Sequence, residues 1–352
     1  MPTPRSLARG ALLQFPPLRR LVEGRDRLQA ELHAATARLA AQAAELDRRE
    51  ARLAAACAAL AHLEAETAGM RAARAEDRLF ITEYAYHPAA RPLASSAGGR
   101  QLDAQFRKAL PGIEATLAGI ATEAQGLARI PRLADGTLRP FWQNDWFPPF
   151  DGAALYGLIA RHRPRLYLEV GSGISTRFAR QAIADLGLAT RIVSIDPHPH
   201  NALAGLCDET IVSRMEDMPA SFWEGLQPGD MLFIDNSHRS FPGSDVTIFF
   251  TELLPALPPG VIYGIHDIFL PQDYPKAWNH RFYSEQYLLM AYLLGGAGAD
   301  EILLPVAWAS GEPGLHGRLA ALWARDDLFH GLSTHGGAFW ARRGTPPAAP
   351  AG

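Results

Sequence analysis

The spacing of the leucines in the first quarter of the chain predicts one long helix. Between residues 25 and 80 there is no proline, and leucine recurs every seven residues at positions 32, 39, 46, 53 and 60. A heptad repeat of this kind is typical of a coiled coil, and a helix of that length would be roughly 80 Å long at about 1.5 Å per residue. If the leucines occupy the d positions, the a positions hold weaker core residues, namely Gln29, Thr36, Ala43, Glu50 and Cys57. The pattern therefore allows a homodimer through this helix, and it also allows a solvated helix that folds back on the chain.

From residue 165 onward the pattern changes to short apolar runs that alternate with amphipathic segments. The apolar runs predict strands at 165–170, 191–196, 209–213, 231–235, 261–266, 301–309 and 338–342. Helices are expected between them at 175–186, 218–225, 244–257, 284–294 and 315–324. Repeated strand–helix units with nearly all-apolar strands imply a sheet that is covered on both faces. We therefore expect an α/β fold, a Rossmann-like, doubly wound and mostly parallel sheet of seven strands, preceded by the long heptad helix.

These two patterns divide the chain into five expected regions. Residues 1–24 are expected to form an irregular leader, 25–80 the long helix, 81–150 a linker and helical arm, 151–343 the main domain and 344–352 a flexible tail. The arm ends in PFWQNDWFPPFD (140–151), which is too aromatic for a free linker. Its aromatic residues suit a clasp that packs the arm on the main domain, and Trp146, Phe147 and Phe150 suit the wall of a ligand pocket. The two interpretations are compatible.

Composition narrows the class of protein. A formal charge of −3 gives no reason to expect a nucleic-acid partner, which usually requires a concentrated basic face. The two cysteines, Cys57 and Cys207, form neither a disulfide framework nor a zinc-site spacing, which fits a reducing compartment. The N-terminal apolar run is too short and interrupted for a secretory signal, and no apolar segment is long enough to span a membrane. The sequence thus predicts a cytoplasmic protein.

The segment LYLEVGSGIST (166–176) carries the first chemical signal. It reads as a strand, a glycine turn and a helix start, in which Gly171 and Gly173 permit a tight turn and close approach of a ligand. Asp196 ends the next strand, where a carboxylate suits the two hydroxyls of a ribose. This pattern would serve NAD or S-adenosylmethionine. Glu169, just before the turn, favours the second, because it would repel a pyrophosphate and attract a cationic ligand.

Four motifs in order resemble a known family. EVGSGIST, SIDP (194–197), GDMLFIDNSH (229–238) and GIHDIFLPQDYP (264–275) resemble class I S-adenosylmethionine-dependent methyltransferases. More narrowly, they resemble a bacterial group found beside glycosyltransferase and polysaccharide genes. The resemblance covers about residues 140–343 and leaves out the heptad helix. Ser175 stands where the family's glycine turn usually has a third glycine.

The resemblance implies a set of cofactor-binding residues. The turn would hold the methionine part of the cofactor, Asp196 its ribose, and Met215 with Glu216 would flank its adenine. The full set implied for cofactor binding is Glu169, Gly171, Ser172, Gly173, Ser175, Asp196, Glu216 and Asp235.

The ends of the two neighbouring strands imply the reacting centre. Asp235, His238, His266 and Asp267 should converge there, and a near-neutral imidazole of His238 or His266 would remove a proton from the acceptor. Some related O-methyltransferases bind Mg²⁺ at such strand ends, so Asp235 and Asp267 are the expected metal ligands. Those enzymes usually place a further ligand directly after the second Asp, where this chain has Ile268.

The expected function is O-methylation of a hydroxyl on a sugar, a glycan or another small molecule. The loop after the fifth strand would bind this acceptor through Asp273, Tyr274, Lys276, Trp278 and His280. Two alternatives stay open at this point: an NAD-type oxidoreductase on the same kind of sheet, and a non-catalytic scaffold with a coiled coil and a cofactor-binding domain.

Overall fold

The structure is a computed structural model that describes residues 15–76, 83–199, 203, 205–297 and 299–345. The chain divides after Tyr86 into two compact units. The ends of the expected leader and tail, residues 1–14 and 346–352, lie outside the described residues, as do the last residues of the expected helix, 77–80.

The described part of the first unit consists mainly of one helix, α2 (Pro16–Ala75), in which no residue is buried. Proline fits the first turn of a helix, because the amide hydrogen that it lacks has no partner there. The helix therefore begins at Pro16 and takes in residues 16–24, which were expected to be irregular. The heptad leucines lie exposed along it, at 57–67% of their surface. The predicted long helix is thus confirmed.

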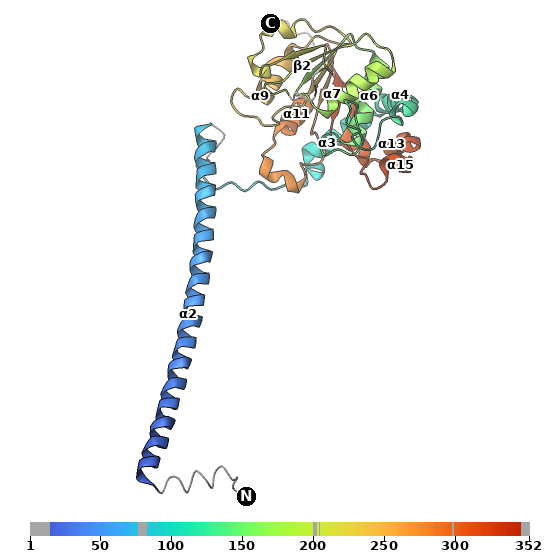
Figure 1. The fold of residues 1–352 in the computed structure, drawn as a ribbon. Coiled ribbons are helices and arrows are strands. Elements are labelled where there is room, and N and C mark those ends of the chain that lie inside the picture. Colours follow the sequence, from blue (N-terminus) through green and yellow to red (C-terminus); the bar gives the residue numbers. More distant parts are fainter. Residues whose placement is uncertain (1–14, 77–82, 200–202, 204, 298, 346–352) are drawn as a thin grey trace. The chain divides into compact units, whose positions relative to one another are not determined.

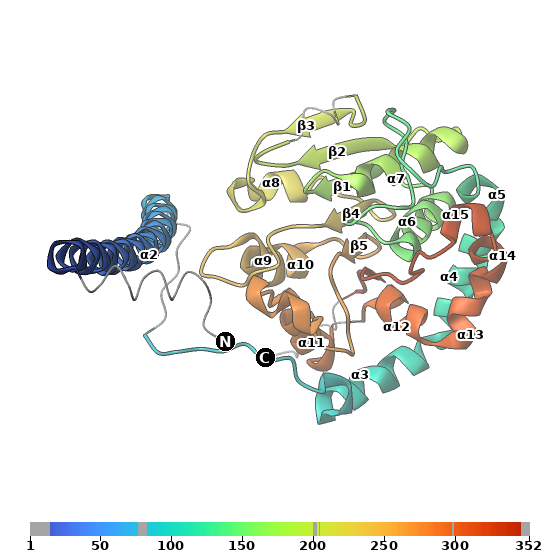
Figure 2. The same cartoon turned by 60° about the horizontal axis from the view of Figure 1, so that its bottom comes forward.

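The second unit contains the predicted seven-stranded sheet, with helices packed around it (Figure 1). The strands are β1 (Leu166–Val170), β2 (Arg191–Ile195), β3 (Glu209–Ile211), β4 (Met231–Ile234), β5 (Ile262–Ile265), β6 (Glu301–Pro305) and β7 (Phe339–Arg342). Their order is β3-β2-β1-β4-β5-β7-β6, and β7 runs antiparallel to both of its neighbours, β5 and β6. Figure 2 shows β3, β2, β1, β4 and β5 following one another across the sheet.

The register of the parallel strands places their carboxyl ends at one edge. Val170 at the end of β1 pairs with Ile195 of β2 and with Ile234 of β4, and Ile234 pairs in turn with Ile265 of β5. The residues that follow these strands must therefore lie side by side. Those residues carry the glycine turn, Asp196, Asp235 and His266, so the sheet brings the predicted motifs together.

The sheet core is apolar and tightly packed around β5. Trp340 of β7 stacks on Phe233 of β4, with ring centroids 5.1 Å apart and planes 16° apart. A side chain at Gly264 would come within 2.5 Å of the Trp340 ring. Only glycine at position 264 leaves room for the Trp340 indole to lie over β5.

The helices of the second unit surround this sheet. The first of them are α3 (Ala97–Lys108), α4 (Leu110–Thr122), α5 (Ala124–Leu127), α6 (Pro149–His162), α7 (Ile174–Asp185) and α8 (Ala220–Trp223). They are followed by α9 (Asp245–Ile248), α10 (Leu254–Ala256), α11 (Glu285–Leu294), α12 (Val306–Gly311), α13 (Pro313–His316), α14 (Ala320–Trp323) and α15 (Asp326–Phe329). Leu102, Phe106 and Leu117 of the arm belong to the same hydrophobic core as the sheet.

The structure differs from the expected elements at several further places, and the helix expected at 315–324 is one of them, since a 3-10 segment (Gly317–Leu319) divides it into α13 and α14. Helix α6 was not predicted, because nearly all of its side chains are buried and it has no polar face to reveal its period. The strand expected at 301–309 ends at Pro305, and the chain turns into α12, which carries Trp308 to within 5.5 Å of the Phe106 ring. The helix expected at 244–257 is divided by a π-helical segment, Phe249–Leu253.

Candidate active site

The glycine turn after β1 is built as its sequence predicts. Gly171 has φ +82°, and a side chain there would come within 2.1 Å of the carbonyl oxygen of Asp235. Only glycine fits this position. Gly173 is different, because its φ is −168° and no atom lies within 4 Å of where a side chain would begin. The open space beside Gly173 is where a ligand can approach the backbone.

Asp196 lies against this turn. Its Oδ2 accepts hydrogen bonds from the backbone nitrogen of Ser172 at 3.0 Å and from the Ser172 hydroxyl at 2.8 Å. Its Oδ1 accepts from the backbone nitrogen of His198 at 2.8 Å. A carboxylate has about four acceptor positions, so this half-buried group can still accept from a ribose hydroxyl.

Glu169 is fully buried beneath the glycine turn and does not line its open side. Its side chain has no exposed surface, and it accepts hydrogen bonds from the hydroxyls of Tyr167, at 3.0 Å, and Thr176. Burial raises the pKa of Glu169 to about 7, against the opposing effect of hydrogen bonds from Ser175, Thr176 and Tyr167. Glu169 therefore ties β1 to the start of α7, and it can act on a cationic ligand through its charge rather than by direct contact.

The other residues assigned to the cofactor fall into two groups. Ser175 is buried, with 2% of its surface exposed, and belongs to the hydroxyls around Glu169. Glu216 lies beyond β3, half-buried, with an Oε1 that is 3.7 Å from Arg214. The neighbouring Met215 is buried.

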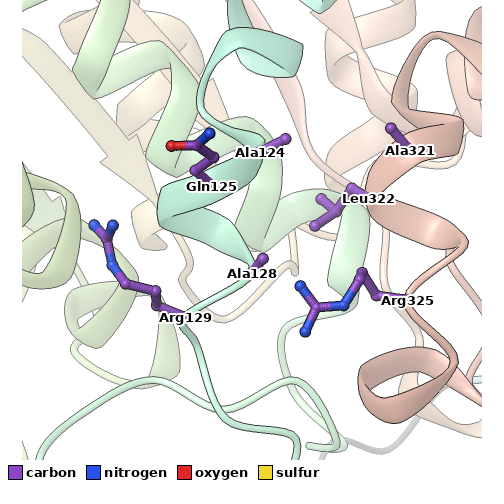
Figure 3. Close-up of a pocket in the computed structure, with 7 residues that line it drawn as sticks. All are labelled: Ala124, Gln125, Ala128, Arg129, Ala321, Leu322 and Arg325. Carbon is purple, nitrogen blue, oxygen red and sulfur yellow. The ribbon is translucent and has the colours of Figure 1, made fainter.

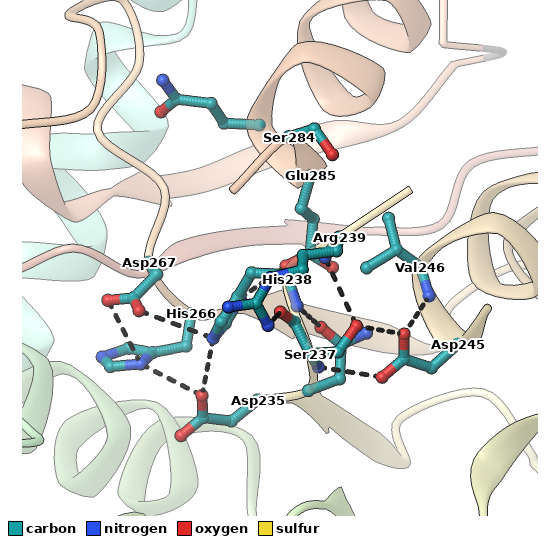
Figure 4. Close-up of polar contacts among 12 residues, drawn as sticks. Asp235, Ser237, His238, Arg239, Asp245, Val246, His266, Asp267, Ser284 and Glu285 are labelled. Carbon is teal, nitrogen blue, oxygen red and sulfur yellow. Dashed lines mark hydrogen bonds and ion pairs between the residues drawn. The ribbon is translucent and has the colours of Figure 1, made fainter. Parts of the chain in front are cut away.

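The four polar residues at the ends of β4 and β5 do converge (Figure 4). His238 Nε2 lies 3.4 Å from Asp235 Oδ1 and 3.4 Å from Asp267 Oδ2. His266 Nδ1 lies 3.3 Å from Asp235 Oδ1 and 3.7 Å from Asp267 Oδ1. Each imidazole thus faces both carboxylates, and we call these four side chains the acid–imidazole ring.

Two carboxylates that the sequence reasoning missed complete this centre. Glu285, the first residue of α11, has its Oε2 2.8 Å from His238 Nδ1. Asp151, in the first turn of α6, has its Oδ2 3.6 Å from His266 Nε2. Both side chains are fully buried. Asp151 also accepts from the backbone nitrogens of Gly337 and Ala338, so it fastens the segment before β7 to the site.

The charges of these neighbours set the protonation of the two imidazoles. Burial alone would lower the pKa of His238, but its hydrogen bonds with Asp235 and Glu285 raise that pKa to about 10. For His266 too, burial is outweighed, here by the charge of Asp235 and by Asp151, and its pKa lies well above the usual value. The neighbouring carboxylates thus favour the protonated form of both rings. The role of His238 or His266 as the group that removes the acceptor proton stays a prediction.

The two carboxylates of the ring behave differently from each other. The charge of His266 and the hydrogen bond from His238 outweigh burial and hold the pKa of Asp235 below its usual range. Burial dominates at Asp267 and raises its pKa. One third of the Asp235 side chain is exposed (33%), against 14% for Asp267, so both are within reach of a ligand.

The backbone at this centre is strained. His238 has φ +58° and Asp267 has φ +54°, both in the left-handed region. Such conformations cost of the order of 1–3 kcal/mol for residues other than glycine and are found chiefly at functional sites. In this backbone conformation the side chains of His238 and Asp267 point toward each other and toward Asp235.

The expected Mg²⁺ would have to share Asp235 and Asp267 with the two imidazoles. The oxygens of Asp235 and Asp267 that face inward are directed at imidazole nitrogens, which already supply positive charge. Within the described ranges, no group of three or more His, Cys, Asp or Glu side chains is arranged to hold a metal ion. The metal role of Asp235 and Asp267 gains no support from this arrangement and stays a prediction.

The aromatic stretch before α6 packs mainly as a clasp. Trp142, Phe147 and Phe150 are buried in the core, whereas Trp146 is 75% exposed. The Phe147 ring lies 5.2 Å from the His266 imidazole, so the clasp also walls the acid–imidazole ring.

The expected acceptor loop lies beside the same centre. Tyr274 donates from its backbone nitrogen to Asp273, and its hydroxyl accepts from the backbone nitrogen of Gln286 at 3.1 Å. Lys276, Trp278 and His280 belong to a short 3-10 helix, Lys276–Arg281. The side chains of Lys276 and His280 are exposed.

A separate surface pocket of about 320 Å³ lies between α5 and α14 (Figure 3). It is lined by Ala124, Gln125, Ala128, Arg129, Ala321, Leu322 and Arg325. Both of its arginines have carboxylate partners, Asp185 for Arg129 at 3.3 Å and Asp327 for Arg325 at 2.8 Å. None of the predicted site residues contributes to this pocket.

Two further expectations concern the whole chain. Among the residues that the structure describes, no helix has both the length and the apolar character needed to cross a bilayer. Cys57 and Cys207 are both free thiols, the first exposed and the second half-buried.

Comparison with protein families identifies the class of the domain that contains this site. Residues 168–268 match the family Methyltransf_24, described as a methyltransferase domain. The chain carries a methyltransferase domain. The matched range runs from β1 past the acid–imidazole ring, and with the seven-stranded sheet it confirms the predicted class I methyltransferase. Enzymes of this class take the methyl group from S-adenosylmethionine, which is thus the expected cofactor of the methyltransferase domain.

Solved structures and curated proteins add less. The methyltransferase PaMTH1 from Podospora anserina, solved with SAH bound, is 15% identical, with 65% of this chain and 88% of that chain covered and a TM-score of 0.36. Rv0187 from MTB, solved with its cofactor, is 17% identical over 66% and 89% of the two chains, with a TM-score of 0.34. The methyltransferase MycE, in complex with Mg, SAH and mycinamycin VI, is 16% identical over 56% of each chain, with a TM-score of 0.30. No curated protein matches the chain. Similarity this weak carries no argument about function, and the polysaccharide-gene association stays a prediction.

Proposed function

We propose that the methyltransferase domain O-methylates a hydroxyl group of a sugar, a glycan precursor or a similar small molecule. The observation that carries this proposal is the juxtaposition of two features at one edge of the sheet. One is the open backbone at Gly173 beside Asp196, and the other is the acid–imidazole ring at the ends of β4 and β5. A donor seat and a proton-handling centre therefore adjoin each other.

The donor seat would be formed by the turn and by Asp196. Gly173 leaves room for the methionine part, and Asp196 would accept from the ribose hydroxyls. When bound, S-adenosylmethionine supplies a methyl group on a positively charged sulfur. The carboxylate of Glu169 would stabilise the positively charged sulfur electrostatically without touching it, because a charge in the buried interior is weakly screened.

The acid–imidazole ring would handle the proton of the acceptor hydroxyl. Because the neighbouring carboxylates favour the protonated form of both imidazoles, the proton would pass to a carboxylate of the ring, and the imidazolium groups would stabilise the developing charge. The four groups titrate as one unit, because each touches its neighbours. Positioning of the hydroxyl in line with the donor would supply much of the remaining acceleration.

The direct test is transfer of a labelled methyl group. Purified protein would be incubated with methyl-labelled S-adenosylmethionine and with separate pools of sugars, lipid-linked glycans and small phenols. We expect label in one pool and a slower transfer by Asp267→Asn, with cofactor affinity unchanged. Asp327→Asn, a change in an exposed ion pair, is the matched control. Equal rates for Asp267→Asn and the parent would remove Asp267 from the reacting centre.

Calorimetric titration with S-adenosylmethionine and with NAD, run beside this transfer assay, separates the two alternatives. An NAD-type oxidoreductase would bind NAD and not S-adenosylmethionine. A non-catalytic scaffold would bind S-adenosylmethionine and methylate none of the pools. The intact glycine turn and the acid–imidazole ring favour turnover over the scaffold.

We also propose that α2 joins two copies of the chain as a coiled coil. Its leucine seam is exposed along the described helix, and burial of one leucine is worth about 1.5–3 kcal/mol. A second copy carries the same seam in the same heptad register, so it is the partner that matches best. The cytoplasmic location stays a prediction.

A further inference from the structure

Two arginines and two aromatic rings form a distinct cluster beside the acid–imidazole ring. Arg239 follows β4, whereas Trp278, Arg281 and Tyr283 come from the segment after β5. The guanidinium carbon of Arg281 lies 4.1 Å from the Trp278 ring centre. The guanidinium carbons of Arg239 and Arg281 lie 5.2 Å and 5.5 Å from the centre of the same Tyr283 ring. We call these four side chains the arginine–aromatic site.

The two segments that supply this site are fastened to each other. Arg239 donates from Nε to the backbone oxygen of Arg281 at 2.8 Å. The backbone nitrogen of Ser284 donates to the backbone oxygen of His238 at 2.8 Å, and the Ser284 hydroxyl accepts from the backbone nitrogen of Ser240 at 2.9 Å. The position of the Arg239 guanidinium group is thus set before any ligand arrives, and Arg281 is held on the Trp278 ring, which lowers the entropic cost of binding.

The positive charge of the site has no carboxylate partner within the described part of the chain. Arg239 donates only to backbone oxygens, those of Arg281 and Ser237, and the contacts of Arg281 are with aromatic rings. Several other arginines of the domain have a carboxylate partner, as Arg214 has in Asp217 at 2.7 Å, whereas Arg177 donates only to backbone oxygens. Two cations against one ring repel each other, and an anion between them would remove that repulsion.

The arginine–aromatic site adjoins the reacting centre. The Tyr283 ring lies 4.6 Å from the His238 imidazole, so Tyr283 separates the two guanidinium groups from the acid–imidazole ring by one side chain. Both arginines and Tyr283 are half-buried, which leaves them reachable from solvent. One small molecule can therefore place a hydroxyl at the acid–imidazole ring and a second group at the arginines.

We propose that the arginine–aromatic site binds an oxyanion of the acceptor, a phosphate or a carboxylate, so that the methylated molecule is acidic. A phosphorylated sugar or a uronic acid has this chemistry. The guanidinium fork matches both oxyanions with paired hydrogen bonds, and the planar rings hold the guanidinium groups flat. This inference rests on the proposed methyl transfer to a hydroxyl and adds the charge of its acceptor.

The test is calorimetric titration of the full-length protein with glucose 6-phosphate, glucuronate and uncharged glucose at low ionic strength. We expect at least one acidic sugar to bind at least tenfold more tightly than glucose. Comparison of the affinities for glucose 6-phosphate and glucuronate then shows whether phosphate or carboxylate is the better anion. The double variant Arg239→Gln with Arg281→Gln should lose at least tenfold of that affinity. Arg281→Lys should keep part of it, because the charge remains. Arg325→Gln, in an exposed ion pair at the surface pocket, is the control and should bind as the parent does.

Three results would overturn the inference. Equal binding of glucose and both acidic sugars would show that the site takes no anion. Equal binding by the double variant and the parent, with unchanged thermal unfolding, would place the anion elsewhere. A tenfold loss of S-adenosylmethionine affinity in the double variant would assign the arginines to the carboxylate of the cofactor. If the parent bound no S-adenosylmethionine at all, the proposed function would fail separately, whatever the acidic sugars did.

Discussion

The buried carboxyl of Glu169 gives the sharpest prediction, because its charge is costly in the free protein and useful with a cationic ligand. Its pKa is raised by burial from an ordinary 4.5 to about 7. At about 1.36 kcal/mol for each pKa unit, this difference corresponds to about 3 kcal/mol. The folded chain holds this proton to a higher pH than the unfolded chain does. Stability is therefore lost as the pH rises from about 4.5 through 7.

Glu169→Gln removes this cost without changing the size of the side chain. The amide stays neutral, and the hydroxyls of Tyr167 and Thr176 can accept from it as well as donate. We expect the variant and the parent to differ little at pH 5, and the variant to gain up to about 3 kcal/mol over the parent at pH 8.5. For a domain of this size that is about 6–12 °C in melting temperature.

Thermal unfolding followed by tryptophan fluorescence is the suitable assay. All seven tryptophans lie after residue 86, so the signal reports the sheet unit and not α2. Glu209→Gln, at an exposed position of β3, controls for the loss of a carboxyl group in general. A difference between Glu169→Gln and the parent that does not change with pH would refute the reasoning. The variant should also bind S-adenosylmethionine more weakly than the parent, since the favourable charge is gone.

Three other changes test separate parts of the account. Gly171→Ala should lower the melting temperature of the domain, because the added methyl group would meet the Asp235 carbonyl oxygen. Gly173→Ala should melt like the parent and bind S-adenosylmethionine at least tenfold more weakly. Equal behaviour of the two variants in unfolding and in calorimetry would contradict this. Asp196→Ala should weaken cofactor binding by about 1.5–3 kcal/mol, the scale of a charge-assisted hydrogen bond; unchanged affinity in calorimetry would remove Asp196 from the site. Mild oxidation should link two chains through Cys57, which occupies an a position of the heptads. This link should double the mass on a non-reducing gel, and Cys57→Ser should abolish the doubling. A parent that stays monomeric on the gel after oxidation would exclude a parallel, in-register coiled coil.

The sheet could be predicted from sequence because each strand is a short, nearly continuous apolar run. Residues 231–234 and 262–265 are buried throughout, and both runs were expected as strands. The same burial hid α6, since a helix that is apolar all round has no period to detect. Trp308 reads as part of a strand in sequence, and only its packing on Phe106 shows why the chain turns into α12.

The candidate site was predicted where its residues follow strands, and it was missed where they come from elsewhere. Asp235 and His266 follow adjacent parallel strands, so their convergence could be inferred from the order of the motifs. Asp151 and Glu285 stand in the first turns of helices, where an acidic residue ordinarily serves the helix dipole. Their contacts with the imidazoles depend on tertiary packing. Those contacts also raise the imidazole pKa values, which no local pattern indicates.

The most direct test of the central claim is calorimetric titration of the protein with S-adenosylmethionine and, separately, with NAD. The account predicts saturable binding of one S-adenosylmethionine per chain, which Gly173→Ala and Asp196→Ala each weaken, and no binding of NAD. Binding of NAD alone, or S-adenosylmethionine affinity that neither variant changes, would contradict it.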